Sequence, residues 1–248
     1  MPKNNHSLGI IPARFASTRF PGKPLVEING KSMIMRVYEQ AVKSSLNEVV
    51  VATDDKRIFE HIKSSNGRVV MTSPFHKTGT DRCAEVAAMQ AFSSFDLIVN
   101  VQGDEPFIQP AQIDLVLTFM KNNTSFSVCT LAKKISDHSK LFDPNTVKVV
   151  FDKYGKALYF SRSTIPFVKQ VPNDEPGNAL NVYKHVGIYG FRNSTLLEVT
   201  SLPSSPLEEA ESLEQLRWME NGYSIGVQIT DIETIGVDLP GDLERLTT

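Results

Sequence analysis

The strongest constraint on the fold of this chain is an alternation of short apolar runs and helical patterns in its first hundred residues. Runs rich in Val, Ile and Leu lie at residues 8–11, 48–53 and 96–101. Between them, apolar residues recur at three- and four-residue spacing, as they do from residue 32 to residue 42. Continuous apolar runs are typical of strands whose two faces are both covered by helices. The alternation therefore predicts a mostly parallel, doubly wound α/β sheet.

The second half of the chain is less regular. Strands are expected at 127–133, 147–152, 157–161 and 183–191, and one amphipathic helix at 205–221. The polar stretch 169–181 is interpreted as a loop or a subunit contact. No linker or internal repeat divides the sequence, so residues 1–248 are expected to form one domain with an elaborated C-terminal part.

Composition and motifs exclude several classes of protein. The 26 basic and 28 acidic residues nearly balance, so no general attraction to nucleic acid or to an anionic membrane is expected. Cys83 and Cys129 lie in no CxxC motif, which argues against a disulfide framework or a zinc site. No G-x-G-x-x-G motif follows the first apolar run, which argues against a dinucleotide-binding protein. No apolar stretch reaches the length of a membrane span, so the expected location is the cytoplasm.

A basic loop follows the first apolar run. It contains three cations, Arg14, Arg19 and Lys23, and two hydroxyl groups, on Ser17 and Thr18. Prolines within and beside the loop restrict its backbone, so less entropy is lost when an anion binds. Cations on several sides suit a triphosphate, because charge-assisted hydrogen bonds are the strong ones. The alternative is an ordinary basic surface loop.

Carboxylates follow other apolar runs. Asp54 follows the second run, and Gly103 and Asp104 follow the third. Ligands bind at the carboxyl ends of parallel strands, so Arg14, Asp54 and Asp104 are expected to meet at one crevice. There Asp104 can hold Mg²⁺ against phosphate oxygens, and Asp238, after a later apolar run, can complete the metal site. The alternatives are an acidic turn at residue 104 and a helix N-cap at residue 238.

Further polar groups have weaker signals. The loop 76–82 leads into a helix whose N-terminus can face a base or a phosphate, although a capping turn explains it equally well. Glu211 and Gln215 are four residues apart on the expected late helix, so they would share a face and could hold sugar hydroxyls, or simply be solvated. Three more polar groups lie at expected strand ends, where spacing alone makes them core or rim residues: Arg162, His185 and Tyr189.

Together these motifs resemble one enzyme family, the 3-deoxy-manno-octulosonate (KDO) cytidylyltransferases, also called CMP-KDO synthetases. The motifs that carry the resemblance run in order over the chain, at residues 11–25, 51–54, 79–82, 100–106, 157–162, 185–190, 205–217 and 236–238. The resemblance implies a nucleotide-diphospho-sugar transferase fold, which is Rossmann-like, a homodimer and a requirement for Mg²⁺. It also implies transfer of CMP from CTP to KDO, with release of pyrophosphate, in lipopolysaccharide biosynthesis.

The resemblance and the residues together assign roles in the site. The expected nucleotide-binding residues are Ala13, Arg14, Ser17, Thr18, Arg19, Lys23, Thr80, Arg82 and Gln102. Arg14, Arg19, Lys23 and Asp104 are expected to act on the reacting phosphates, and Asp104 and Asp238 to bind the metal. The expected sugar-binding residues are Gln102, Arg162, His185, Tyr189, Glu211 and Gln215. The alternatives are a related acidic sugar, such as 8-amino-KDO or a nonulosonic acid, and a nucleotide-binding regulator without turnover.

Overall fold

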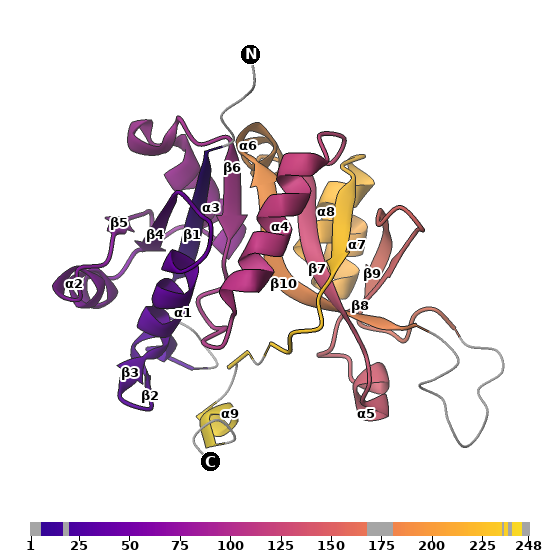
Figure 1. Cartoon of the computed structure of the whole chain (residues 1–248), viewed down its shortest axis with the longest axis horizontal. Helices are drawn as coiled ribbons and strands as arrows, with labels where there is room; N and C mark the ends of the chain where they lie inside the picture. The colour runs from indigo at the N-terminus through magenta and orange to yellow at the C-terminus, as the bar shows by residue number, and fades with distance from the viewer. Residues whose placement is uncertain (1–5, 17–19, 168–180, 235, 238–239, 245–248) are drawn as a thin grey trace.

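A computed structural model of the chain describes residues 6–16, 20–167, 181–234, 236–237 and 240–244. One twisted sheet runs through the described part, with helices on both of its faces (Figure 1). The helices are α1 (Met33–Val42), α2 (Lys56–Ser64), α3 (Gly79–Ala88), α4 (Pro110–Asn122), α5 (His138–Phe142), α6 (Asn193–Thr200), α7 (Pro206–Glu211), α8 (Glu214–Glu220) and α9 (Pro240–Glu244). Two 3₁₀ turns, η1 (Lys23–Leu25) and η2 (Gln90–Phe92), complete the helical elements of this part.

The main path of the sheet has the order β11-β7-β10-β6-β1-β4-β5. Its strands are β1 (Ser7–Ala13), β4 (Glu48–Thr53), β5 (Val69–Met71), β6 (Leu97–Asn100), β7 (Val128–Lys134), β10 (Tyr183–Arg192) and β11 (Ile225–Ile229). Along this path only β10 runs against its neighbours, β6 and β7. β8 (Lys148–Phe151) and β9 (Ala157–Ser161) extend from β10 as antiparallel strands, and β2 (Glu27–Ile28) forms a separate hairpin with β3 (Lys31–Ser32). The mostly parallel sheet expected from the sequence is confirmed.

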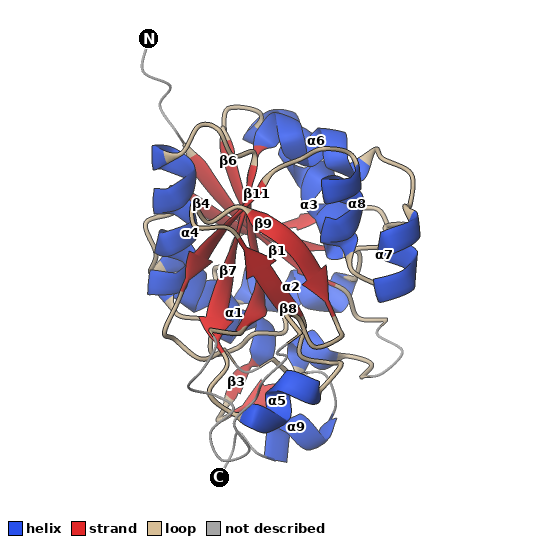
Figure 2. Cartoon of the chain, turned by 90° about the vertical axis from the view of Figure 1, so that its right-hand side faces the viewer, coloured by secondary structure: helices blue, strands red, loops and turns tan. Residues whose placement is uncertain are grey.

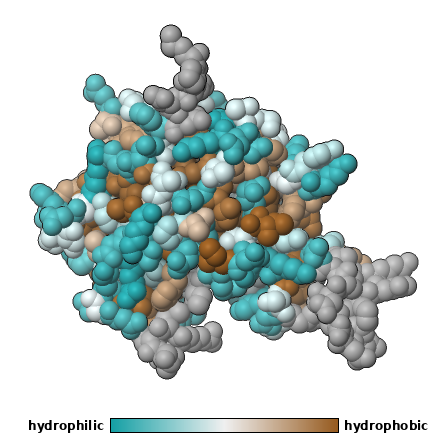
Figure 3. Space-filling model, viewed as in Figure 1, coloured by the Kyte–Doolittle hydropathy of each residue, from teal (hydrophilic) through white to brown (hydrophobic). Residues whose placement is uncertain are grey.

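Alternation along the buried strands divides the core into two layers. On β1, Leu8 and Ile10 face one layer, while Ile11 and Ala13 face the other. The first layer includes apolar residues of α3, α6 and α8, and the second includes those of α1, α2 and α4. Figure 2 accordingly shows α4 on one side of the sheet and α3 and α6 on the other. On the face shown in Figure 3, apolar residues lie in small groups among polar ones.

Helix starts and turns follow local chemistry. The side chain of Ser32 accepts a hydrogen bond from the Met35 amide at the start of α1, and Asp55 caps α2 in the same way. Asn29 and Gly30 both have positive φ in the tight turn between β2 and β3, as the Asn-Gly pair predicts. None of the described helices is long and apolar enough to cross a membrane.

The expectation of a single helix at 205–221 is wrong. The segment forms two short helices, α7 and α8, because Ser212 adopts a left-handed conformation between them, with φ of 52°. Glu211 ends α7 and Gln215 lies in α8, so the two side chains do not share a helix face. The structure also contains α4, α6 and β11, for which the sequence patterns gave no expectation.

Candidate active site

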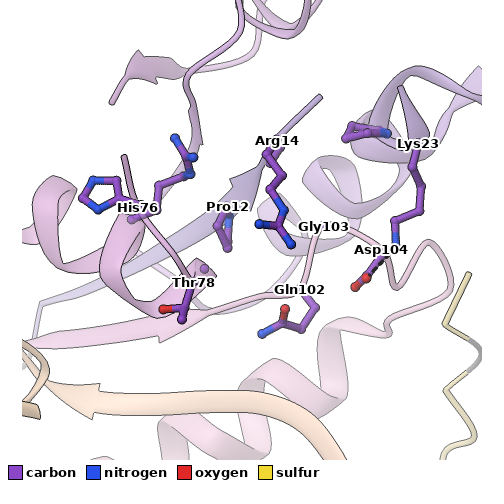
Figure 4. Close-up of a pocket in the computed structure, with 12 residues that line it drawn as sticks. Pro12, Arg14, Lys23, His76, Thr78, Gln102, Gly103 and Asp104 are labelled. Atoms are coloured by element: carbon purple, nitrogen blue, oxygen red, sulfur yellow. Dashed lines mark hydrogen bonds and ion pairs between the residues drawn. The ribbon is translucent and has the colours of Figure 1, made fainter. Parts of the chain in front are cut away.

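A pocket of about 180 Å³ opens at the carboxyl ends of β1 and β6. Its position is that expected for a ligand site in a parallel sheet. Gly103 allows the two strand ends to approach each other, since a Cβ at this residue would lie 2.8 Å from the Pro12 carbonyl oxygen. Figure 4 shows the pocket. The residues that line it are Pro12, Ala13, Arg14, Lys23, Pro24, His76, Thr78, Gly79, Arg82, Gln102, Gly103 and Asp104.

The basic loop and the segment after β6 form two walls of this pocket. Arg14 is exposed, and Figure 4 shows its guanidinium pointing toward the segment that carries Gln102 and Gly103. The Lys23 Nζ lies 2.8 Å from Asp104 Oδ2 and donates a hydrogen bond of 2.8 Å to the Val237 carbonyl oxygen. The structure thus brings Asp104 together with Arg14 and Lys23 of the basic loop, which is distant in sequence. Ser17, Thr18 and Arg19, from the same loop, lie outside the described residues.

Asp104 also connects the pocket to the C-terminal segment. Its carbonyl oxygen accepts a hydrogen bond of 3.0 Å from the Val237 amide. Asp238, the other expected metal ligand, lies outside the described residues. Within the described ranges, no group of three or more His, Cys, Asp or Glu side chains could hold a metal ion. Mg²⁺ commonly uses one or two carboxylates together with waters and substrate phosphates, so the Asp104 carboxylate in this cation-lined pocket fits this ion.

A third wall comes from the loop before α3. Thr78 and Asp81 form a reciprocal capping box, which fixes the loop where Thr78 and Gly79 face the pocket. Arg82 lines the pocket although it is only 3% exposed. Its guanidinium is held by Thr72, by the Ser73 carbonyl oxygen at 3.3 Å and by Asp54 Oδ2 at 3.1 Å. Asp54 therefore supports a pocket residue and does not itself line the pocket.

Thr80 lies one layer behind this wall. Its hydroxyl donates a hydrogen bond of 2.7 Å to Glu214 Oε2, and it is not among the residues that line the pocket. The other carboxylate oxygen of Glu214 is buried without a hydrogen-bond partner among the described residues, with Arg217 Nη2 4.0 Å away. Burial raises the pKa of Glu214. Glu214 has no signal in the sequence apart from its place beside Gln215.

Two expected sugar-binding residues, His185 and Tyr189, lie together on β10. Their ring centroids are 5.3 Å apart, and Tyr189 also packs edge-on against Trp218. His185 Nε2 lies 2.9 Å from the Thr130 hydroxyl, and burial lowers the pKa of His185 to about 3. Burial raises the pKa of Tyr189, whose hydroxyl has no hydrogen-bond partner in the described part of the chain.

β10 meets the pocket through Gln102. A Cβ on Gly187, which lies between His185 and Tyr189, would be 3.8 Å from the Gln102 Cγ. Gln215, on α8, is only 4% exposed, and its side-chain nitrogen has no hydrogen-bond partner among the described residues. Buried polar atoms without partners are uncommon in native proteins, and those of Tyr189, Glu214 and Gln215 are therefore candidates to bind a polar ligand.

Arg162 and Glu211 contact each other and do not line the pocket. The Glu211 carboxylate accepts hydrogen bonds from the Ser161 hydroxyl at 2.6 Å and from the Arg162 amide at 2.9 Å. The Arg162 guanidinium donates to the carbonyl oxygens of Glu211, Pro144 and Ser212. In this structure these contacts connect β9 to α7 and to the loop after α5, so the sugar-binding roles of Arg162 and Glu211 stay predictions.

Glu105 is a second acidic residue for which the sequence predicts no role. Its Oε2 atom is buried and has no hydrogen-bond partner among the residues that the structure describes. Burial, together with the neighbouring Asp104 charge, raises the pKa of Glu105 to about 7. The carboxyl group lies on the side of Gly187, because a Cβ there would be 4.0 Å from Glu105 Oε1.

Comparisons with known proteins agree with this geometry. The cytidylyltransferase family model matches residues 8–231. The chain is 53% identical over 241 residues to 3-deoxy-manno-octulosonate cytidylyltransferase of Parabacteroides distasonis, covering 96% of this chain and 95% of the relative. The enzyme of the same name from Cytophaga hutchinsonii is 50% identical over 250 residues, covering 100% of this chain and 98% of the relative.

Solved structures show the same similarity. The structure of CMP:2-keto-3-deoxy-manno-octonic acid synthetase complexed with CTP superposes with a TM-score of 0.88 at 40% identity, covering 98% of this chain and 97% of that one. The 4-diphosphocytidyl-2C-methyl-D-erythritol synthase of Anaerococcus prevotii has a TM-score of 0.63 at 14% identity, covering 98% and 94%, and shares the fold. The chain belongs to the 3-deoxy-manno-octulosonate cytidylyltransferase family.

Proposed function

We propose that the chain transfers CMP from CTP to KDO and releases pyrophosphate, as a step of lipopolysaccharide biosynthesis. The observation that carries this proposal is the meeting of Arg14, Lys23 and Asp104 at the carboxyl ends of β1 and β6. Two cations and one carboxylate around a small pocket suit a triphosphate with its counter-ion. The names of the relatives, and the CTP bound in the related synthetase, support a cytidine nucleotide and an eight-carbon acidic sugar.

In the proposed reaction, the anomeric C2 hydroxyl oxygen of KDO attacks the α-phosphorus of CTP. A bond forms between this oxygen and phosphorus, the bond to the β-phosphate oxygen breaks, and the hydroxyl proton is lost to solvent as pyrophosphate departs. Negative charge grows on the α-phosphoryl and leaving oxygens during this step. Arg14 and Lys23 line the pocket where they can stabilise that charge, and Arg19 is proposed to act with them.

Mg²⁺ is the proposed cofactor, held by Asp104 and Asp238. When bound, Mg²⁺ would neutralise phosphate charge, and a second ion bound to the sugar would lower the pKa of the attacking hydroxyl. Lys23 now pairs with Asp104 and keeps this carboxylate near the pocket. No described side chain of the pocket needs to act as a general base in this scheme.

The sugar is proposed to bind between Gln102 and the buried groups of β10 and α8. Tyr189, Glu214 and Gln215 each have a buried polar atom without a partner, and a sugar hydroxyl would satisfy it. His185 is neutral at physiological pH, since burial lowers its pKa to about 3, so its role is hydrogen bonding and not proton transfer. Ala13 and the Thr80 loop are proposed to select cytosine.

A homodimer is also proposed, on the basis of the family resemblance and of two exposed aromatic residues. Phe142 and Phe167 are 66% and 86% exposed, although aromatic side chains of this size are usually buried. A partner subunit over these residues would remove their apolar surface from water. Size-exclusion chromatography with light scattering measures the oligomeric state directly, and a monomer at micromolar concentration would contradict the dimer.

The test of the function is a pyrophosphate-release assay with CTP and Mg²⁺. KDO is expected to support turnover better than 8-amino-KDO or a nonulosonic acid. Asp104→Asn is expected to lose nearly all activity and keep its fold, because the amide holds a cation far less well than the carboxylate. Glu39→Gln is the matched control, since it breaks another lysine–carboxylate pair, with Lys31 at 2.6 Å, that does not line the pocket.

Three outcomes of this assay would contradict the proposal. Near-normal turnover of Asp104→Asn would refute the metal assignment. Faster turnover of another acidic sugar would change the substrate. Binding of CTP without pyrophosphate release from any sugar in the panel would favour a nucleotide-binding regulator.

A further inference from the structure

The basic loop is closed at its base by Phe15 and Gly22. The Gly22 amide donates a hydrogen bond of 3.0 Å to the Phe15 carbonyl oxygen. Gly22 has φ of 74°, and a Cβ there would lie only 3.0 Å from the Phe15 Cζ, so the aromatic ring fills the space beside this glycine. Arg14 immediately precedes this closure and Lys23 immediately follows it. The position of the Phe15 ring therefore affects where both pocket cations lie.

A second element, α2, holds the Phe15 ring. The Cζ atom of Arg57 lies 3.3 Å from the Phe15 ring centroid, which is a stacked cation–π contact. Asp55 holds the guanidinium in a fork, with 2.9 Å between Nε and Oδ1 and 2.6 Å between Nη2 and Oδ2. Asp55 is also the N-cap of α2, accepting a hydrogen bond of 2.9 Å from the Arg57 amide. The stack is thus fixed to a helix whose Ile58 and Ile62 are fully buried.

We propose that Arg57 is a positioning residue for nucleotide binding, which acts by clamping Phe15 and so preorganising the base of the basic loop, beside Arg14 and Lys23. The inference rests on the proposed function only in taking this loop as the binding site of the CTP triphosphate. Cations whose backbone is already held in place lose less conformational entropy when they bind a ligand, so the clamp increases affinity without contacting the ligand. Arg57 does not line the pocket, and its guanidinium is engaged by Asp55 and Phe15.

The first test compares CTP affinities by isothermal titration calorimetry. Arg57→Ala is expected to bind CTP about two- to fivefold more weakly, which is the scale of a cation–π contact at an exposed site. The matched control is Arg68→Ala, because Arg68 also stacks on a phenylalanine, Phe92, at 4.9 Å, and also pairs with a carboxylate, Glu48. This second stack does not involve the basic loop, so the control is expected to bind CTP like the wild type.

A second test separates positioning from direct attraction between Arg57 and the phosphates. Asp55→Asn removes a negative charge and keeps a good N-cap, since Asn and Asp cap helices equally well. Direct attraction predicts that this variant binds CTP more tightly. Positioning predicts weaker binding, because the guanidinium loses its charged fork and holds Phe15 less firmly.

A double-mutant cycle then tests whether Arg57 acts through Phe15. Phe15→Ala is expected to weaken CTP binding, and adding Arg57→Ala to it is expected to cause no further loss. In steady-state assays, Arg57→Ala should raise KM for CTP while kcat and KM for the sugar stay unchanged, which a general loss of structure would not produce.

Four results would overturn the inference. These are equal CTP affinity of Arg57→Ala and the wild type, equal losses in Arg57→Ala and Arg68→Ala, unchanged or tighter binding by Asp55→Asn, and additive losses in the cycle. Failure of the wild type to bind CTP would instead overturn the proposed function, so the two failures are distinguishable.

Discussion

A fall in pH from 7 to 5 should destabilise the protein through His185. The imidazole packs against Phe160 and Tyr189, with ring centroids 5.2 Å and 5.3 Å away. The Thr130 hydroxyl can donate to the Ile188 carbonyl oxygen at 2.8 Å, which leaves it as the acceptor for the Nε2–H of His185. Burial lowers the pKa of His185 to about 3, so the folded protein holds this ring neutral.

The sign and the size of the effect follow from linkage. The pKa of an unfolded histidine is about 6.5, so between roughly pH 6.5 and pH 3 the unfolded chain binds a proton that the folded chain does not. Stability therefore falls as the pH falls through this window. At pH 5, about 1.5 units below the unfolded pKa, the loss is about 2 kcal/mol.

The assay is urea unfolding of the wild type and of His185→Gln at both pH values. Gln does not titrate and can keep the hydrogen bond to Thr130, so the stability difference between the two proteins should shift by about 2 kcal/mol in favour of the variant at pH 5. A difference that is the same at pH 7 and pH 5 would refute this reasoning. An NMR titration in which the His185 ring shows a midpoint near 6.5 would refute it independently.

Three other changes have specific expected outcomes. Arg19→Ala should weaken CTP binding in calorimetry, because the basic loop would lose a cation, and unchanged affinity would count against the role of Arg19. Gly103→Ala should lower the unfolding free energy by about 1–3 kcal/mol and reduce turnover, since the new Cβ would lie 2.8 Å from the Pro12 carbonyl oxygen. An unchanged midpoint of urea unfolding would contradict this close approach. Lys148→Met should lower the unfolding free energy by about 3 kcal/mol, because the Nζ of the fully buried Lys148 donates to the carbonyl oxygens of Asp143, Thr146 and Arg162. Urea unfolding measures this loss, and wild-type stability would contradict the need for these hydrogen bonds.

The parallel half of the fold was predictable because its signals are local. The apolar runs at 8–11 and 48–53 form β1 and β4, and the ends of these strands lie within two residues of the expected ends. In contrast, α4 packs against four strands and α1, so it carries apolar residues on much of its surface. The helical period of its apolar residues is therefore hard to recognise in the sequence. β11 is short and pairs only with β7 on the main path, so its place depends on a partner nearly a hundred residues earlier.

The prediction of one helix at 205–221 was wrong for a different reason. Nothing in the spacing of apolar residues from 205 to 221 marks a break, yet Ser212 takes a left-handed conformation there. The Glu211 carboxylate is held by Ser161 and Arg162, which are far away in sequence, and these tertiary contacts are invisible to a helical pattern. Because the segment forms two helices, Glu211 and Gln215 do not share the helix face that was expected for them.

The site was predictable in part. Arg14, Lys23 and Asp104 follow strand ends or loops whose residue types already favour phosphate and metal chemistry, and the structure brings them together. Glu214 was missed because its distinguishing property is burial beside Thr80, and burial of a single carboxyl group cannot be inferred from its position in the sequence. Asp54 was expected at the crevice and instead supports Arg82.

The hydrogen bond from Lys23 to the Val237 carbonyl oxygen has a consequence for how the protein is made. The two residues are 214 positions apart, and the ion pair of Lys23 with Asp104 spans 81 positions. During synthesis the N-terminal strands leave the ribosome long before residue 237, so a nascent chain cannot yet form this hydrogen bond to the pocket residue Lys23. Nucleotide can therefore stabilise the protein fully only after residue 237 emerges, and a chain truncated before residue 237 should gain less from ligand binding even where its sheet has formed.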